Sequence, residues 1–237
     1  MLNIREVKAR IESMQDYSGS LRVFRLRLAD DFSFAPGQFV MLSIPGLVDS
    51  NGRKIAKAYS ISSSPDEKTL ELCIVHYQNG ALSPPLFKMP AGSEVTVTGP
   101  YGLFVLKEPV PLGAVFIAGG TGLAPILSML RFLYSKGFKG KLWLFYSMSE
   151  PRLFLFRDEL LGYQKNNGLQ LVASTSNPGA NWLFEKGRVT DAFPGHAAKI
   201  PKDSGFYLCG PPAMVIDTVK MLEELGYKKE NIHREQW

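Results

Sequence analysis

The sequence predicts two domains: an antiparallel β-barrel followed by an α/β domain built on a doubly wound parallel sheet. A chain of 237 residues is long enough for two domains of ordinary size. Up to about residue 105, short strand-like runs are separated by turns, whereas apolar runs and helical patterns alternate further on. The segment 107–113 between these regions contains two prolines and a glycine. We therefore place the domains at 1–106 and 107–237.

Four runs in the first region are typical of strands. Phe24–Leu28 alternates apolar and polar residues, as a half-buried strand does. Phe39–Ile44 follows a turn at Pro36-Gly37, and Leu70–Val75 and Glu94–Thr98 are two further runs rich in strand-forming residues. Short strands with Gly, Pro and Asp turns favour a closed antiparallel barrel.

The second region alternates strand and helix patterns, which implies a parallel sheet covered by helices. Its first strand, Ala114–Ala118, is a continuous apolar run, as expected for a strand that is buried on both faces. The other expected strands are 141–146, 169–173 and 205–209. The expected helices cover about 124–135, 156–164 and 213–225, and the last of them stops at Gly226.

The charge pattern argues against a nucleic-acid binder. The formal net charge is +5, but the basic residues are scattered instead of gathered with aromatic residues. Arg22, Arg25 and Arg27 alternate with apolar residues, as on the solvated face of a strand. The mild basic bias would also steer an acidic partner protein toward the chain.

Cysteine and histidine spacing predicts no metal site. Cys73 and Cys209 form no CxxC pair, and an iron–sulfur cluster needs about four thiolates. The three histidines show no ligand spacing. No apolar run approaches the ~20 residues that span a bilayer, and the first residues lack the layout of a signal peptide. We therefore expect no membrane span and a cytoplasmic location.

Two strand-to-helix turns of the second region carry the residues of a phosphate site. Gly119-Gly120-Thr121-Gly122 follows the buried strand, where glycines let a ligand approach the backbone and a helix N-terminus favours an anion. Pro125 replaces the third glycine of the strict fingerprint, and proline suits the first turn of a helix. Cys209-Gly210-Pro211-Pro212 opens on the same sheet edge. A ligand-free turn, or a buried structural cysteine, would use the same residues.

The first region offers a second ligand-binding pattern. Lys57-Ala58-Tyr59-Ser60 supplies a cation for a phosphate, an aromatic face for stacking and a hydroxyl for a ring nitrogen. Gly80-Ala81-Leu82-Ser83 adds a flexible turn and another hydroxyl, and Gly99–Phe104 is a further turn. Taken alone, these residues are better explained by a plain strand with an outward tyrosine, and Gly99–Phe104 by a turn that closes the barrel.

Taken in order along the chain, these motifs resemble the ferredoxin–NADP reductase superfamily over essentially the whole sequence. They are Lys57–Ser60, Gly80–Ser83, Gly99–Phe104, Gly119–Pro125, Cys209–Pro212 and Glu235-Gln236-Trp237. The resemblance implies that the barrel binds FAD and that the α/β domain binds NADH or NADPH.

The same resemblance assigns the site residues. Ser60, Cys209 and Glu235 are the implied catalytic residues, with Tyr59 stacked on the isoalloxazine, Ser60 bonded to its N5 and Cys209 beside the nicotinamide. The implied FAD contacts are Lys57, Ala58, Tyr59, Ser60, Ile74, His76, Gly80, Leu82 and Ser83, with Trp237 over the flavin face. The implied nicotinamide dinucleotide contacts are Gly119, Gly120, Thr121, Gly122, Cys209, Gly210 and Pro211. Lys57 departs from the usual arginine of the family: it keeps the charge but loses the bidentate fork, so FAD binding is expected to be retained but weaker.

The expected activity is an FAD-dependent NAD(P)H oxidoreductase of the ferredoxin or flavodoxin reductase kind. The chain would pass single electrons to a separate, acidic carrier protein: a ferredoxin, a flavodoxin or an oxygenase subunit. The acceptor stays open, because the motifs resemble both bacterial ferredoxin/flavodoxin reductases and reductase components of oxygenases. A reductase of free flavin or small oxidants and a redox-inactive binding subunit are the alternatives.

The donor is expected to be NADH. The segment Ser174–Asn177 follows a strand and lacks a cation for a 2′-phosphate. Arg152 and Arg157, on a neighbouring loop and helix, are the residues that could replace it.

Overall fold

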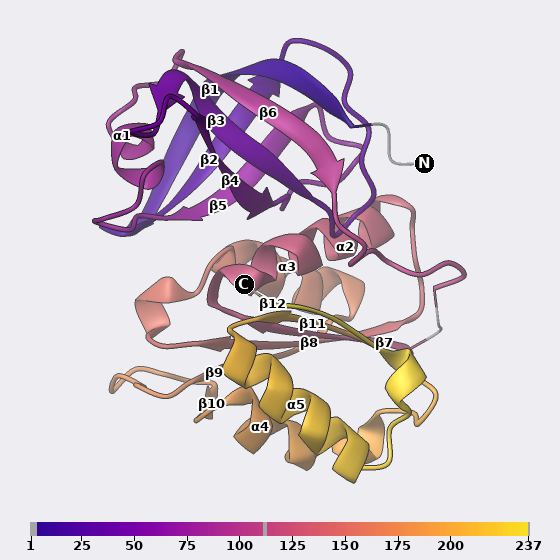
Figure 1. Ribbon diagram of the computed structural model, residues 1–237. Coiled ribbons are helices and arrows are strands. Elements are labelled where there is room, and N and C mark those ends of the chain that lie inside the picture. The colour runs from indigo at the N-terminus through magenta and orange to yellow at the C-terminus, as the bar shows by residue number, and fades with distance from the viewer. Residues whose placement is uncertain (1–3, 111–112, 237) are drawn as a thin grey trace. The chain divides into compact units, whose positions relative to one another are not determined.

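The computed structural model describes residues 4–110 and 113–236. The contacts of the chain divide into two units (Figure 1). The first contains residues up to Val105 together with Leu127–Ser135, and the second contains Leu106–Ile126 and the residues from Lys136 onward. The helix α2 (Leu123–Ser135) therefore begins in the second unit, while its last nine residues are grouped with the first.

The first unit is a six-stranded antiparallel sheet that curls into a barrel (Figure 1). Its strands are β1 (Arg5–Ser18), β2 (Leu21–Leu28), β3 (Phe39–Val48), β4 (Lys54–Ser60), β5 (Thr69–Val75) and β6 (Glu94–Tyr101), in the order β4-β3-β6-β1-β2-β5. A short helix, α1 (Ser83–Phe87), lies between β5 and β6 in the chain. An isolated antiparallel bridge from Ile61 to Leu72 connects the end of β4 with β5 and closes the barrel.

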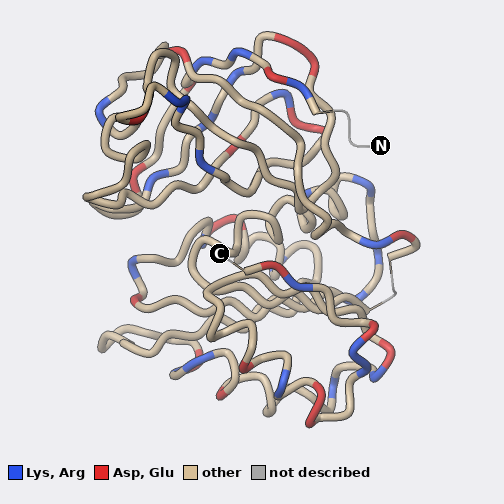
Figure 2. Tube along the Cα trace, in the orientation of Figure 1, with Lys and Arg blue, Asp and Glu red and all other residues tan. Residues whose placement is uncertain are grey.

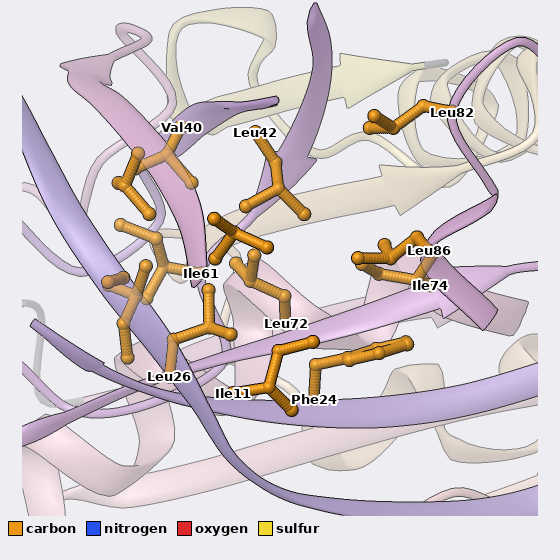
Figure 3. Packing of buried hydrophobic residues seen from close by; sticks show 14 residues of the cluster. Ile11, Phe24, Leu26, Val40, Leu42, Ile61, Leu72, Ile74, Leu82 and Leu86 are labelled. Carbon is orange, nitrogen blue, oxygen red and sulfur yellow. The ribbon is translucent and has the colours of Figure 1, made fainter. Parts of the chain in front are cut away.

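Apolar side chains of the strands fill the barrel (Figure 3). Along β2, Phe24 and Leu26 are completely buried, whereas Arg25 and Arg27 between and after them are exposed. This alternation removes apolar surface from water on one face and leaves the cations hydrated on the other. It agrees with the predicted half-buried strand.

The second unit is a six-stranded sheet in which every adjacent pair is parallel. Its strands are β7 (Gly113–Gly119), β8 (Lys141–Met148), β9 (Gln170–Thr175), β10 (Glu185–Lys186), β11 (Gly205–Gly210) and β12 (Ile232–Gln236), in the order β10-β9-β8-β7-β11-β12. The helices α4 (Val189–Ala192) and α5 (Pro212–Glu224) lie on one face of this sheet and α3 (Arg157–Asn167) on the other (Figure 1). Four 3-10 segments complete it: η1 (Gly120–Gly122), η2 (Pro151–Leu153), η3 (Phe193–Lys199) and η4 (Lys229–Asn231).

The predicted fold is confirmed, but several elements were missing from the prediction. The barrel has β1 and β4 in addition to the four expected strands, and β12 was not expected at all. In β1, Val7, Ala9 and Ile11 face the core and alternate with charged residues that point outward. The second half of the strand is mostly polar and has no such alternation, so the strand as a whole shows no clear period. The strand β12 is mostly polar and is held by its parallel pairing with β11.

Charge is dispersed along both units, with basic and acidic positions interspersed (Figure 2). Three barrel arginines that alternate with apolar residues each meet a carboxylate: Arg22 pairs with Asp16, Arg25 with Glu71 and Arg27 with Glu12. These cations therefore form compensated pairs instead of a basic patch.

Two further observations concern the described residues. None of their helices is both long and apolar enough to cross a membrane. No group of three or more His, Cys, Asp or Glu among residues 4–110 and 113–236 is arranged to hold a metal ion.

Candidate functional site

The strand β4 presents the first set of candidate residues at the edge of the barrel sheet. Lys57 and Ala58 are exposed, and Tyr59 and Ser60 are half-buried, with Tyr59 opposite Val40 of β3. Within the described part of the chain, the side chains of Lys57 and Ser60 make no hydrogen bond or ion pair. An ammonium group and a hydroxyl are thus left available on the same short strand segment.

The Tyr59 side chain is a neutral aromatic surface at physiological pH. Burial raises its pKa to about 12 because it disfavours the phenolate, and the nearby Tyr77 adds to the effect. A half-buried ring with its hydroxyl protonated is suited to stacking on another flat ring.

The loop from Tyr77 to Ser83 is tied back on itself by the Ser83 hydroxyl. The backbone N–H of Tyr77 donates to Ser83 Oγ at 2.9 Å, and Ser83 Oγ lies 3.3 Å from the Tyr77 carbonyl oxygen. A Cβ on Gly80 would come within 2.9 Å of Ser83 Oγ and 3.1 Å of the Tyr77 carbonyl oxygen. The buried Ser83 hydroxyl therefore shapes the loop, and glycine is needed at position 80 because the loop folds so tightly.

Three other predicted FAD contacts lie close to this loop in the chain. Ile74 and Leu82 are fully buried in the barrel core, so their side chains pack inside the barrel and not at its surface. His76 is half-buried, with its ring 5.0 Å from that of Phe87 at the end of α1.

In the second unit, the two predicted turns lie against each other at the carboxyl ends of adjacent parallel strands. The strands β7 and β11 are paired with Cys209 opposite Ala118. A Cβ on Gly122 would lie 2.3 Å from the Cys209 carbonyl oxygen, and a Cβ on Gly210 would lie 3.1 Å from the Gly119 backbone nitrogen. Only glycine lets the two backbones approach this closely.

The remaining residues of these turns leave room for a ligand. A Cβ on Gly120 would meet nothing within 4 Å, and this residue has a φ of 54°. Thr121 is half-buried and its hydroxyl makes no hydrogen bond to another described residue. Pro211 is half-buried and its Cδ would lie 3.0 Å from a Cβ on Gly119. Gly120 and Thr121 belong to η1, which leads directly into the N-terminus of α2, where a phosphate is favoured.

Cys209 and Glu235 are neighbours across the β11–β12 pair. Burial raises the pKa of the Cys209 thiol well above its usual range, and the nearby Glu235 adds to this shift. Burial also raises the pKa of the Glu235 carboxyl to about 7. Below that pH the pair consists of a neutral thiol and a neutral carboxyl. The structure therefore places the Cys209 thiol, which carries no charge, beside the Glu235 carboxyl, which can bind and release a proton.

Two residues with polar roles were not found from the sequence. Glu71 of β5 and Arg131 of α2 form a buried ion pair within the first unit. The available signal was a single charge in an apolar run, in Leu70–Val75 and again in the predicted helix 124–135. Trp237 lies outside the described residues.

The two regions fit the groups that their motifs imply. On β4, an exposed ammonium, a neutral aromatic face and a hydroxyl that bonds to no other described residue suit a cofactor with a phosphate and a flat heteroaromatic ring. At the β7 and β11 turns, the open Gly120, the half-buried Thr121 and a helix N-terminus suit a dinucleotide phosphate.

Comparison with known families agrees with this assignment of chemistry. Residues 8–106 match the family model of the oxidoreductase FAD-binding domain. Residues 116–220 match that of the oxidoreductase NAD-binding domain.

Curated relatives resemble the chain over nearly its full length. The reductase component of propane 2-monooxygenase from Mycolicibacterium goodii is 31% identical over 240 residues, covering 97% of this chain and 67% of the relative. The corresponding component from Rhodococcus jostii is 32% identical, and the chain spans 62% of its length. Ferredoxin–NADP reductase B from Sorangium cellulosum is 28% identical and matches along 100% of both chains.

Solved structures have the same fold. The cytochrome P450 reductase of Amycolatopsis superposes with a TM-score of 0.86 at 27% identity, covering 100% of this chain and 71% of the other. A ferredoxin–NADP+ reductase from Neisseria gonorrhoeae with bound FAD and NADP superposes with a TM-score of 0.83 at 24% identity, covering 99% and 98%.

Proposed function

The chain belongs to the ferredoxin–NADP reductase superfamily, and from this premise we propose that it is a reductase that moves electrons from NAD(P)H through FAD to a separate carrier protein. FAD, when bound, supplies the chemistry that links the two-electron donor to a one-electron acceptor. The protein contributes binding, orientation and control of protons. The observation that carries the proposal is the contact between the turns after β7 and β11, with Gly122 against Cys209.

In the first unit, we assign FAD binding to β4 and the Tyr77–Ser83 loop. Lys57 would hold a phosphate with its ammonium, Tyr59 would pack its ring against the flavin, and Ser60 would donate its hydroxyl to a ring nitrogen. The exposure of Lys57, the neutral Tyr59 ring and the unpartnered Ser60 hydroxyl support these roles. The loop around Gly80 would receive the pyrophosphate on its backbone.

In the second unit, we assign the dinucleotide to the glycine turn and its neighbours. Thr121 and the backbone of Gly120 would bind phosphate at the start of α2, with Gly210 and Pro211 bordering them. Cys209 and Glu235 would line the place where the nicotinamide lies. The neutral thiol avoids adding a negative charge there, and the Glu235 carboxyl can hold or release a proton near pH 7.

The proposed acceptor is an acidic electron-carrier protein such as a ferredoxin, a flavodoxin or an oxygenase subunit. Two of the relatives above are reductase components of oxygenase systems and one is a ferredoxin reductase. The net charge of +5 would accelerate encounter with an acidic partner. Because many barrel arginines are already paired, this steering is a property of the whole charge distribution.

The test is a spectroscopic and kinetic titration of the purified chain. It should bind about one FAD, and NADH or NADPH added anaerobically should bleach the visible flavin absorbance. Ferredoxin, flavodoxin and free FMN are then offered separately, and the carrier proteins should be reduced faster than FMN. A chain that fails to take up FAD would overturn the proposal, and a preference for FMN would identify a reductase of free flavin instead.

A further inference from the structure

The barrel closes immediately after the proposed flavin motif. In the sheet order, β4 and β5 are the two edge strands, and the Ile61–Leu72 bridge joins the end of β4 to β5. The N–H of Ile61 donates to the Gln38 carbonyl oxygen at 3.0 Å, and the N–H of Ser62 donates to the Glu71 carbonyl oxygen at 2.9 Å. We call this junction, residues Ile61–Ser63 with Glu71 and Leu72, the barrel seam. It begins one residue after Ser60.

A buried carboxylate stands at the centre of the barrel seam. The side chain of Glu71 is 3% exposed and is the single charge in β5. Its Oε1 accepts from Arg131 Nη1 at 2.7 Å and lies 2.9 Å from Ser62 Oγ, while its Oε2 accepts from Arg25 Nε at 3.0 Å. Removing a carboxylate from water costs several kcal/mol unless charged partners and hydrogen bonds offset it. The partners around Glu71 provide this compensation.

The same network fixes backbone atoms of the barrel seam. Arg131 Nη1 also donates to the Ser62 carbonyl oxygen at 3.0 Å. The hydroxyl of Ser128, one helical turn earlier on α2, donates to the Ser63 carbonyl oxygen at 2.7 Å. The N–H of Glu71 in turn donates to Ser63 Oγ at 3.1 Å. Two consecutive peptide groups that follow the flavin motif are thus held by side chains from the part of α2 that belongs to the first unit.

A buried charged network such as that of Glu71 is not needed for the stability of the fold alone. Well-packed apolar residues of similar volume often stabilise a core as well as a buried ion pair or better. What ions and directional hydrogen bonds add is a fixed geometry for the groups they join. At the barrel seam those groups are the backbone atoms that end β4.

We propose that Glu71 is a positioning residue of the flavin site, which acts with Arg131 through Ser62 to fix the backbone that carries Tyr59 and Ser60. This inference rests on the proposed FAD site. Without the ion pair, β4 keeps its pairing with β3 and Ser63 keeps its bonds to Ser128 and to the Glu71 N–H. Ser62 loses the side-chain bonds that fix it to Arg131 and the Glu71 carboxylate, so the tyrosine ring and the serine hydroxyl sample a wider range of orientations. FAD then binds more weakly and in a less uniform environment.

The test uses the double variant Glu71→Gln/Arg131→Gln, which leaves neither charge isolated. The dissociation constant for FAD should rise at least tenfold, about 1.4 kcal/mol. The fine structure of the bound-flavin absorbance and its visible circular dichroism should weaken as well. The matched control is Ile11→Val or Ile11→Ala, whichever loses the same free energy of unfolding, because Ile11 is a fully buried core residue on β1. The control should keep the FAD dissociation constant within threefold.

Arg131→Lys separates positioning from stability. Lysine keeps a charge beside Glu71, but its ammonium is a flexible point charge without the rigid planar geometry by which Arg131 Nη1 donates to both the carboxylate and the Ser62 carbonyl oxygen. It should recover most of the stability lost in the double variant and little of the FAD affinity. If stability and affinity recover together, or if the double variant and the matched control bind FAD equally, the inference is wrong. A wild-type chain that fails to bind FAD would instead remove the proposed function beneath it.

Discussion

The two candidate sites are kept in shape by different physical means. In the first unit, charged and hydroxyl side chains hold the backbone around the flavin motif, as Glu71, Arg131 and Ser83 illustrate. In the second unit, two backbones touch directly, and the absence of a Cβ at Gly122 makes the contact possible. Conservative substitutions should weaken ligand binding gradually at a site that is held by side chains. At a site held by backbone contact, a single added carbon should cause a large loss.

The largest expected effect comes from Gly122→Ala. The new Cβ would lie 2.3 Å from the Cys209 carbonyl oxygen and 2.8 Å from the Gly210 Cα, which are backbone atoms with little room to move. The two turns must separate, so kcat/KM for NADH and NADPH should fall about 100-fold, ~2.7 kcal/mol, while FAD affinity stays within threefold. Steady-state kinetics and flavin titration measure the two quantities.

Gly162→Ala is the matched control for this substitution. Gly162 belongs to α3 in the same unit, and a Cβ there meets nothing within 4 Å. Alanine is favoured over glycine within a helix, so the control should retain full activity. Equal kinetics for Gly122→Ala and Gly162→Ala would show that the contact between the turns is not needed for donor binding.

The next effect concerns the aromatic face in the first unit. Tyr59→Ala should weaken FAD binding about tenfold, ~1.4 kcal/mol, because the half-buried ring and its stacking surface are lost. Tyr59→Phe keeps the ring and should bind FAD within threefold of wild type. Equilibrium fluorescence titration with FAD compares them, and equal affinities for the alanine and phenylalanine variants would rule out stacking by this residue.

The sequence predicted the features that depend on local patterns and missed those that depend on contacts between distant residues. Local patterns identified the strands with clear alternation, such as Phe24–Leu28, and the glycine turns after β7 and β11. The Glu71–Arg131 pair joins residues sixty positions apart, so only the folded barrel brings them together. The strand β12 was missed because its residues are polar and its order comes from pairing with β11. The spacing of apolar residues along the chain indicates which side chains are buried. It contains little information on which residues far apart in the sequence come into contact.

The choice of donor is an effect of the same size, expected at about tenfold in kcat/KM in favour of NADH, ~1.4 kcal/mol. Arg152, one cation that could bind a 2′-phosphate, pairs with Glu150 at 2.6 Å. At the end of β9, the buried Ser174 is in register with Glu185 on β10, which is exposed. A 2′-phosphate bound beside Glu150 and Glu185 would be repelled by both carboxylates. Glu150→Gln should therefore raise kcat/KM for NADPH more than for NADH, and a tenfold preference of the wild type for NADPH would contradict the expectation.

The smallest effect is the pH dependence of stability that Glu235 contributes. It tests an electrostatic property of the second unit, whereas Gly122→Ala tests the backbone contact there. Burial raises the pKa of this carboxyl from 4.5 to about 7. Between these values the folded protein holds a proton that the unfolded chain has released, so stability falls as pH rises from about 4.5 to 7 and then levels off. Glu235 is partly exposed, and solvent screening reduces the contribution to roughly 1 kcal/mol, about 2–4 °C in melting temperature for a chain of this length.

Glu235→Gln imitates the protonated acid at every pH. Wild type and variant should therefore melt together at pH 4, below the ordinary pKa of 4.5, while above pH 7 the wild type should melt lower. Glu224→Gln is the control, because Glu224 is an exposed α5 residue that pairs with Lys220 one turn away. A difference between wild type and Glu235→Gln that is the same at pH 4 and pH 8 would mean that Glu235 does not titrate in this range. The neutral and charged forms of the carboxyl would then not alternate beside Cys209 at physiological pH.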